Sequence, residues 1–195
     1  DKNGIRLWNK QLLEYAGYIV ALRKQALVCL SEELVTLSRD VEDSFSRDLV
    51  IHYKNFALQE HDNESYLDIL SKKLEDSIEK EIMVGYSLYG PHRDDFYITI
   101  NEKSLFSFYS RGINRIFAIL FKIAQFRKLS TEHRCFPVLL MDDAFAELDL
   151  NMKKKMVCLL DGMAQLFYTT VLEEDVSLFS DAQVFKMKKG VLTNG

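Results

Sequence analysis

Two adjacent aspartates, Asp142 and Asp143, directly follow an uncharged run of six residues, 136–141, of which five are apolar. The run indicates a buried strand, and a buried carboxylate is costly unless it is paired, hydrogen-bonded or bound to a metal. Ligands of parallel sheets bind beyond the carboxyl ends of the strands. Asp142 could therefore hold Mg²⁺, and Asp143 could accept a proton from an attacking water. The alternative is a pair of strand-end acids that caps the next helix.

A second candidate site lies in the segment YSRGINR, residues 109–115, which opens a strongly apolar helical pattern. Ser110 and Gly112 would offer a hydroxyl and free backbone N–H groups at the start of this helix, which is a natural anion site. Arg115 adds a positive charge within one turn. The alternative is an ordinary serine N-cap that follows a turn.

The remaining charged candidates have simpler interpretations. Asp149 lies seven residues after Asp142, and taken alone it reads as the N-cap or first-turn acid of a helix over 149–163. Lysines 153–155 are most simply a solvated face of that helix, with contact to a phosphate backbone as the alternative. His92 and Arg93 stand in the turn YGPHRDD, where Arg–Asp pairing within the turn is the plain reading.

The bulk composition is that of an ordinary globular protein: 195 residues, 48% apolar, 28% charged, with a formal net charge of −4. A net negative charge is not that of a basic nucleic-acid-binding module, so any contact with nucleic acid must come from a local patch, a dimer groove or a partner. The three cysteines, Cys29, Cys135 and Cys158, are far apart and sit among apolar residues, as expected of buried, reduced thiols in a cytoplasmic protein. The sequence contains no apolar run of about 18 residues, so it predicts no membrane-spanning helix.

Hydrophobic periodicity predicts the elements that must position these residues. Apolar residues at spacings of three and four predict a long helix from about Ile5 to Phe45 and a second over 62–82 that opens at Asn63. Further along we expect a strand over 48–56, a hairpin of strands 96–100 and 104–109, a helix over 113–129, strands covered on both faces over 136–141 and 165–171, and a closing hairpin over 184–193. Alternation of helices with buried strands predicts an α/β fold.

Four segments in order carry a family resemblance: GPHRDDF, SRGINRIFAILFKIAQ, PVLLMDDAFAELD and QLFYTTV. Together they resemble the carboxyl-terminal two thirds of the RecF family, bacterial DNA replication and repair proteins with an ATPase head of the ABC type. The resemblance is strongest over residues 85–172. It implies a helical arm over residues 1–84 and the carboxyl-terminal lobe of an ABC-type ATPase head over residues 85–195.

The resemblance also implies a signature motif that contacts the nucleotide held by a partner subunit. Ser110, Arg111 and Gly112 match this motif, and Arg115 matches its trailing basic position. The family usually carries Gln after the glycine, whereas Ile113 stands here, and its side chain can neither donate nor accept a hydrogen bond. We therefore expect weaker contacts to a partner's nucleotide.

Other matched positions imply the machinery of phosphoryl transfer. Asp142 matches the Walker B acid that holds magnesium, and Asp143 matches the neighbouring general base. Asp149 matches the D-loop acid, which lies across the dimer interface. Thr169 or Thr170 stands where ABC-type heads place a catalytic switch residue near the terminal phosphate.

What the resemblance implies for the complete protein is an ATP- and Mg²⁺-dependent homodimer in the cytoplasm, away from any membrane. It would act in DNA replication, recombinational repair and the SOS response, bind DNA at single-strand/double-strand junctions and work with RecR- and RecO-type mediators. The alternative is a degenerate, non-catalytic head that serves as a dimerisation or partner-binding module. A head-and-arm ATPase of the SMC or Rad50 kind is disfavoured, because the arm lacks sustained heptads.

The sequence contains no GxxxxGK[ST], the loop that cradles phosphates. In the family this loop lies on the amino-terminal lobe, so we expect the chain to be a fragment, a split gene product or a degraded copy. An apolar sheet face or edge that the other lobe would complete is then expected to stay exposed and to favour self-association.

The missing phosphate loop yields the first testable prediction. The chain alone should bind Mg-ATP weakly and hydrolyse it negligibly, because backbone N–H groups that cradle the phosphates are not supplied. Isothermal titration of the purified chain with Mg-ATP measures this directly. Tight binding would contradict the prediction.

Overall fold

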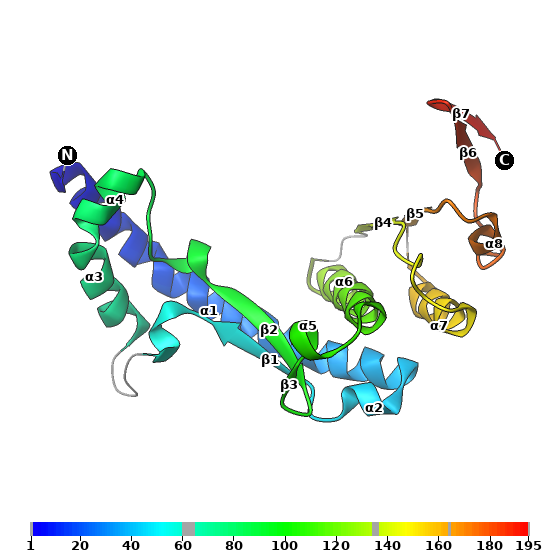
Figure 1. The fold of residues 1–195 in the computed structure, drawn as a ribbon, viewed down its shortest axis with the longest axis horizontal. Coiled ribbons are helices and arrows are strands. Elements are labelled where there is room, and N and C mark those ends of the chain that lie inside the picture. The colour runs from blue at the N-terminus through cyan, green and yellow to red at the C-terminus, as the bar shows by residue number, and fades with distance from the viewer. Residues whose placement is uncertain (1, 60–64, 134–136, 164, 195) are drawn as a thin grey trace. The chain divides into compact units, whose positions relative to one another are not determined.

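The computed structural model describes residues 2–59, 65–133, 137–163 and 165–194, and the chain packs as two units (Figure 1). The first unit combines residues 1–32 with 47–108, and the second combines residues 33–46 with 109–195. Packing thus groups residues 85–108 with the first unit, because a strand within them pairs with an earlier strand. The functional division into residues 1–84 and 85–195 stays a prediction.

Helix α1, Lys2–Val41, runs for 40 residues and confirms the long helix expected from the apolar periodicity. At 1.5 Å per residue it is about 60 Å long. The predicted second helix is divided at Ser77 into α3, Tyr66–Asp76, and α4, Ile78–Val84. Ser65 provides the N-cap of α3 by accepting a hydrogen bond from the Asp68 amide, whereas the expected cap, Asn63, lies outside the described residues.

The core of the first unit lies between α1 and α3. Ala16, Leu70 and Leu74 are fully buried there. Half-buried apolar side chains surround them: Leu12, Leu13, Phe56, Tyr66 and Tyr89. One face of α1 is thus committed to packing against α3, as the periodicity of three and four requires.

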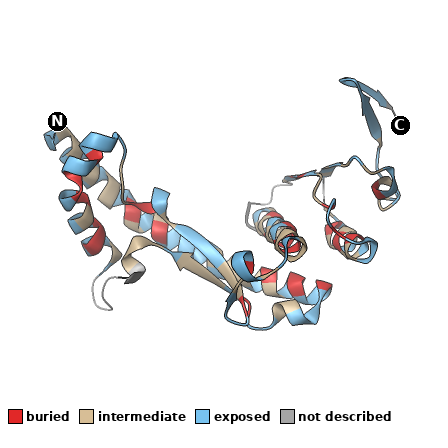
Figure 2. Ribbon diagram, viewed as in Figure 1, coloured by how far each residue is buried: buried red, intermediate tan, exposed pale blue. Residues whose placement is uncertain are grey.

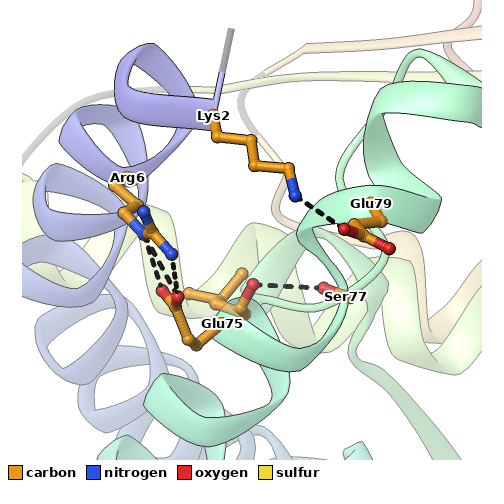
Figure 3. Close-up of polar contacts among 6 residues, drawn as sticks. Lys2, Arg6, Glu75, Ser77 and Glu79 are labelled. Atoms are coloured by element: carbon orange, nitrogen blue, oxygen red, sulfur yellow. Dashed lines mark hydrogen bonds and ion pairs between the residues drawn. The ribbon is translucent and has the colours of Figure 1, made fainter.

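Exposed ion pairs join the first turns of α1 to the end of α3 and to α4 (Figure 3). Arg6 Nη2 lies 2.5 Å from Glu75 Oε1, and Lys2 Nζ lies 2.6 Å from Glu79 Oε1. Hydrogen bonding to Arg6 lowers the pKa of the Glu75 carboxyl. Because these groups are in water, the pairs specify how the helices align more than they stabilise the unit.

The sheet of the first unit is antiparallel, with the order β1-β2-β3. Strand β1, Val50–Lys54, pairs along its whole length with β2, Asp95–Ile100. Strand β3 is only Lys103–Ser104, and helix α5, Leu105–Phe108, follows it, so the predicted strand over 104–109 was wrong. The helical turn brings the Phe108 ring to 4.1 Å from Lys103 Nζ, a contact that an extended strand could not make.

The turn before β2 contains the short 3₁₀ helix η2, Pro91–Arg93. The Arg–Asp pairing predicted within this turn is replaced by other contacts. Arg93 donates to the Ser87 carbonyl at 3.2 Å and lies over the Tyr86 ring, while Asp94 Oδ2 accepts a hydrogen bond from the Tyr53 hydroxyl at 2.5 Å. Burial, followed by this hydrogen bond, raises the pKa of Tyr53 to about 12.

The second unit contains the predicted alternation of helices and strands, which confirms the α/β class. Helix α6, Arg111–His133, is followed by β4, Val138–Asp142, α7, Leu150–Leu160, and β5, Gln165–Thr169. The end of the chain adds α8, Glu173–Val176, and the expected hairpin of β6, Phe185–Lys188, and β7, Val191–Asn194. Buried side chains come from the end of α1 and from α6 and α7: Leu34, Leu37, Val41, Phe117, Leu120, Ile123 and Met156.

Strands β4 and β5 are parallel, and they are covered on one face only. Leu139 and Met141 are buried, whereas Val138 is 48% and Leu140 73% exposed. Figure 2 shows buried residues on the helices α6 and α7 of this unit. Phe167, which stands opposite Leu140 in the register, is also exposed. The expectation that 136–141 and 165–171 are covered on both faces was therefore wrong, because α6 and α7 lie on the same side of the strand pair (Figure 1). The open apolar face agrees with the expectation of an incomplete sheet.

The two described cysteines are not joined by a disulfide. Cys29 and Cys158 are free thiols; Cys158 is exposed on α7, contrary to the expectation that it is buried, and Cys135 lies outside the described residues. Within the described ranges, no helix combines the length and the apolar character needed to cross a bilayer.

The open face of β4 and β5 should drive self-association of the chain. Leu140→Asp places a charge at the centre of this face and should reduce association, because a buried unpaired charge is costly. Sedimentation velocity over a range of protein concentrations measures the effect. Phe106→Asp, at an exposed aromatic of α5 in the first unit, is the control and should leave association unchanged. Equal effects of both substitutions would contradict the assignment.

Candidate functional site

The two strand ends of the second unit bring Asp142 and Thr169 together. They stand opposite each other in the parallel register of β4 and β5. The Thr169 hydroxyl donates a hydrogen bond to Asp142 Oδ1 at 2.5 Å. Asp142 is exposed, so its carboxylate lies at the rim of the sheet with one oxygen engaged by a neutral hydroxyl.

Asp143 turns the chain out of β4 with a left-handed backbone, φ 45°. Its amide donates to the carbonyl of Thr169 at 3.1 Å and to the Thr169 hydroxyl at 3.2 Å. Its side-chain atom Oδ1 is buried and has no hydrogen-bond partner among the described residues. Buried polar atoms are nearly always satisfied, so this oxygen marks a place where a proton donor or a cation is expected.

The start of α6 lies against the loop that follows Asp143. Arg115 Nη2 donates to the carbonyl of Asp143 at 3.2 Å, and Arg115 Nη1 lies 3.3 Å from Glu147 Oε1. A Cβ atom added at Gly112 would lie 4.0 Å from the carbonyl oxygen of Glu147. Arg115 therefore holds the loop over 143–149 in place, a role that its sequence position did not predict.

The signature residues occupy the first turn of α6 and its cap. Ser110 Oγ accepts a hydrogen bond from the Ile113 amide at 3.4 Å, as a serine N-cap does. Arg111 is exposed and Gly112 partly buried. Their predicted contact with a partner's nucleotide stays a prediction.

Asp149 is the N-cap of α7, in agreement with the simpler of its two interpretations. Its carboxylate accepts a hydrogen bond from the Met152 amide at 2.9 Å. One carboxylate oxygen accepts that bond and the residue is exposed, so the cap does not exclude a second contact across an interface.

Thr169 and Thr170, the two candidates for the switch position, have different partners. Thr169 contacts the Asp142–Asp143 pair, whereas the Thr170 hydroxyl donates to Asp175 Oδ2 at 3.0 Å. The geometry thus favours Thr169 as the residue that could act with the two acids, and it assigns Thr170 a supporting position.

Lys153 corrects the prediction of a solvated lysine face on α7. It is only 5% exposed, and its Nζ lies 2.5 Å from Oδ1 of Asp175, which is 1% exposed. Lys155 is partly buried and donates to the Val41 carbonyl at 2.6 Å, while Lys154 is exposed as expected. Lys153 was misread because its partner in the interior, Asp175, lies 22 residues further along the chain.

The buried pair of Lys153 and Asp175 affects the pKa values of the groups beside β5. Burial alone would raise the pKa of the Asp175 carboxyl, but hydrogen bonds from Lys153, Thr170 and Tyr168 outweigh it and hold this pKa below its ordinary value. Burial, followed by the hydrogen bond to Asp175, raises the pKa of Tyr168 to about 12. The Asp175 carboxylate therefore has three partners in this network: the Lys153 side chain and the hydroxyls of Thr170 and Tyr168. Asp175 was missed because the run Glu173 to Asp175 reads as an exposed acidic turn.

The strand-end acids fit a magnesium ion in part. Mg²⁺ is usually held by one or two carboxylates, with waters and phosphate oxygens completing its octahedron. Asp142, and the unpartnered oxygen of Asp143, could supply such ligands. In the ranges that the structure describes, no group of three or more His, Cys, Asp or Glu side chains forms a closed metal site. The acids thus suit an ion that arrives with phosphates rather than one bound by protein alone.

Sequence comparison relates the chain to RecF proteins. No protein-family model matches it. The DNA replication and repair proteins RecF of Staphylococcus carnosus and Clostridium kluyveri are 30% and 34% identical to it, over 97% and 95% of the chain. The matches cover 52% and 50% of those proteins. The chain therefore spans about half the length of the curated relatives it matches, less than the two thirds that the motifs indicated.

Solved structures agree with this relationship. A structure described as the recombination mediator protein RecF-ATP in the RecFOR pathway matches with a TM-score of 0.67 and 26% identity, over 96% of this chain and 49% of that one. A second, described as RecF-ATPrS, matches with a TM-score of 0.74 and 24% identity, over 100% of this chain and 51% of that one. The expected fold and the resemblance to the RecF family are confirmed.

The capping role of Asp149 can be separated from any role at an interface. Asp149→Ala should destabilise the second unit by about 1 kcal/mol, because the Met152 amide loses its acceptor. Asp149→Ser retains an N-cap acceptor and should restore most of the stability. Chemical denaturation of both variants measures the difference. Equal stability of Asp149→Ala and the unchanged chain would contradict the capping role.

Proposed function

We propose that this chain, a relative of the RecF proteins in sequence and fold, forms the arm and carboxyl-terminal lobe of a RecF-like ATPase of DNA replication and recombinational repair. Residues 1–84 would be the arm, and residues 85–195 the lobe with the signature, Walker B and D-loop motifs. The observation that carries the proposal is the pair of acids at the parallel strand ends, with one buried carboxylate oxygen unpartnered beside Thr169.

The acids have the arrangement that phosphoryl transfer requires. Asp142 would hold Mg²⁺, which neutralises charge on the phosphates when it is bound. Asp143 would accept the proton of the attacking water. Thr169 would orient Asp142 through their hydrogen bond and stand near the terminal phosphate. Within the described residues, neither acid is paired with a lysine or arginine side chain.

Binding of ATP is proposed from the relatives, one of which is described as RecF-ATP. The first turn of α6 would contribute in trans. Ser110, Arg111 and Gly112 would face the nucleotide held by a second subunit, with Arg115 behind them, and Asp149 would lie at the contact between the two subunits. The side chain of Ile113 adds no hydrogen bond there, so the contact would depend on backbone N–H groups and on Ser110.

The wider role follows from the names of the relatives, which are DNA replication and repair proteins and recombination mediators of the RecFOR pathway. The complete dimer would bind DNA at single-strand/double-strand junctions and act with RecR- and RecO-type mediators. This chain has a net charge of −4, so its own contact with DNA would need a local basic patch or a groove between subunits.

A second candidate is a binding module without catalysis. Two observations favour it: Ile113 in the signature, and the engagement of Arg115 by Glu147, which leaves less positive charge for a phosphate. In this reading the same surface of α6 and α7 would serve a dimer or partner contact without turnover.

The two candidates differ in the effect of Asp142→Asn. In a full-length RecF protein that carries this segment, the substitution should reduce ATP turnover on the order of 100-fold or more, because the ligand for the metal loses its charge. Steady-state ATPase measurements give the rate, and Asp181→Asn, at an exposed acid after α8, is the matched control. Unchanged turnover in Asp142→Asn would exclude its assigned role, whereas no turnover even before substitution would favour the binding module.

A further inference from the structure

A buried polar network stands behind the strand end that carries Thr169. Asp175 Oδ2 accepts hydrogen bonds from the hydroxyls of Tyr168 and Thr170, each at 3.0 Å. These two residues flank Thr169 in the chain, and side chains alternate between the faces of a strand. Asp175 therefore binds the residue before Thr169 and the residue after it. The Thr169 side chain points to the opposite face of the strand, where it contacts Asp142.

The other oxygen of Asp175 connects this strand end to α7. Lys153 Nζ lies 2.5 Å from Asp175 Oδ1, and both side chains are almost completely buried. The Lys153 amide donates to the carbonyl of Asp149 at 2.9 Å, so Lys153 stands one turn after the helix cap. A short chain of contacts thus runs from the cap of α7, through Lys153 and Asp175, to the backbone around Thr169.

Aromatic rings pack around Tyr168, one member of the network. The Tyr168 ring lies 5.0 Å from the ring of Phe145 and 5.3 Å from that of Phe179. Phe145 is fully buried and belongs to the loop between Asp143 and Asp149. The Tyr168 hydroxyl is therefore held in place by its ring as well as by Asp175, and the loop with the candidate base packs on the same cluster.

The pair is not explained by stability alone. Removing two charges from water offsets much of their attraction, and a buried ion pair can often be replaced by apolar side chains without loss of stability. The contacts instead give each Asp175 oxygen defined partners: Oδ1 faces Lys153, and Oδ2 faces the hydroxyls of Tyr168 and Thr170. That arrangement fixes the rotation of the strand end at Thr169.

We infer that Lys153 and Asp175 are positioning residues that present the Thr169 hydroxyl to the Asp142–Asp143 pair and couple this presentation to the cap of α7. Their importance for turnover rests on the proposed function. Because Asp149 would lie at the subunit contact, the pair would link dimer formation to the geometry of the acids. Positioning itself is a property of the chain alone and can be measured without nucleotide.

The test uses hydrogen exchange of the Asp143 amide, which donates to Thr169. The double variant Lys153→Met with Asp175→Leu removes both charges at similar volume, and Lys154→Met, at the exposed neighbour on α7, is the matched control. The double variant should lose roughly 5- to 10-fold protection at Asp143, the scale of one weakened hydrogen bond. Protection within α6 and α7 should stay unchanged, which separates positioning from a general loss of stability.

A gentler pair of variants covers the case in which the double variant does not fold. Thr170→Val removes one hydroxyl that Asp175 holds, and Thr170→Ser retains it. Thr170→Val should lower protection at Asp143 by a few-fold, and Thr170→Ser should restore it. Unchanged protection at Asp143 in Thr170→Val and in a folded double variant would overturn the inference, and so would an equal loss over the whole second unit.

The proposed function is tested separately in the full-length protein. There the double variant should reduce the maximal ATPase rate at least tenfold with little change in KM, because positioning acts on the reacting arrangement more than on binding. If Asp142→Asn leaves turnover unchanged while Asp143 protection still depends on Lys153 and Asp175, the ATPase assignment fails and the positioning role remains. If the rate is unaffected in the double variant but abolished in Asp142→Asn, the coupling to turnover is overturned.

Discussion

The hydrogen bond from Thr169 to Asp142 joins the ends of two parallel strands, and the candidate site depends on it. Parallel pairing in this register places residues that are 27 positions apart opposite each other. The same threonine accepts the Asp143 amide through its carbonyl and its hydroxyl, so one residue orients both acids. The acids are therefore held by backbone geometry and by a neutral side chain, and in the part of the chain that the structure describes neither is paired with a lysine or arginine.

Two kinds of ion pair serve different ends in this molecule. Arg6–Glu75 and Lys2–Glu79 lie in water, where screening and side-chain entropy leave little net stabilisation. Lys153–Asp175 lies in the interior, where each charge needs the other and also needs the surrounding hydroxyls. We expect substitution of the first kind to have little effect, and substitution of the second to disturb the strand end next to the site.

Elements that depend on local sequence patterns were predicted correctly. The long helix, the strand-end acids and the closing hairpin follow from periodicity, from an abrupt change from apolar to acidic residues, and from a Lys-Gly turn. Prediction failed where tertiary contacts decide. Lys153 is buried together with Asp175, 22 residues away, a pairing that no local pattern indicates. Helix α5 replaces the predicted strand because pairing with β2 extends only over Lys103 and Ser104. The exposed face of β4 could not be read from an apolar run, because such a run does not tell one covered face from two.

Helix α1 contributes residues to both packing units without interruption. Ala16 is buried in the core of the first unit, and Leu34 is fully buried in the part of the helix that belongs to the second. Starting a helix is the unfavourable step, and extending one is cheap. The part of α1 in the second unit therefore continues a helix that starts in the first unit. Unfolding of either core should also destabilise the part of α1 that belongs to the other unit. Cooperativity between the two halves is thus built into the covalent chain, whatever their mutual arrangement.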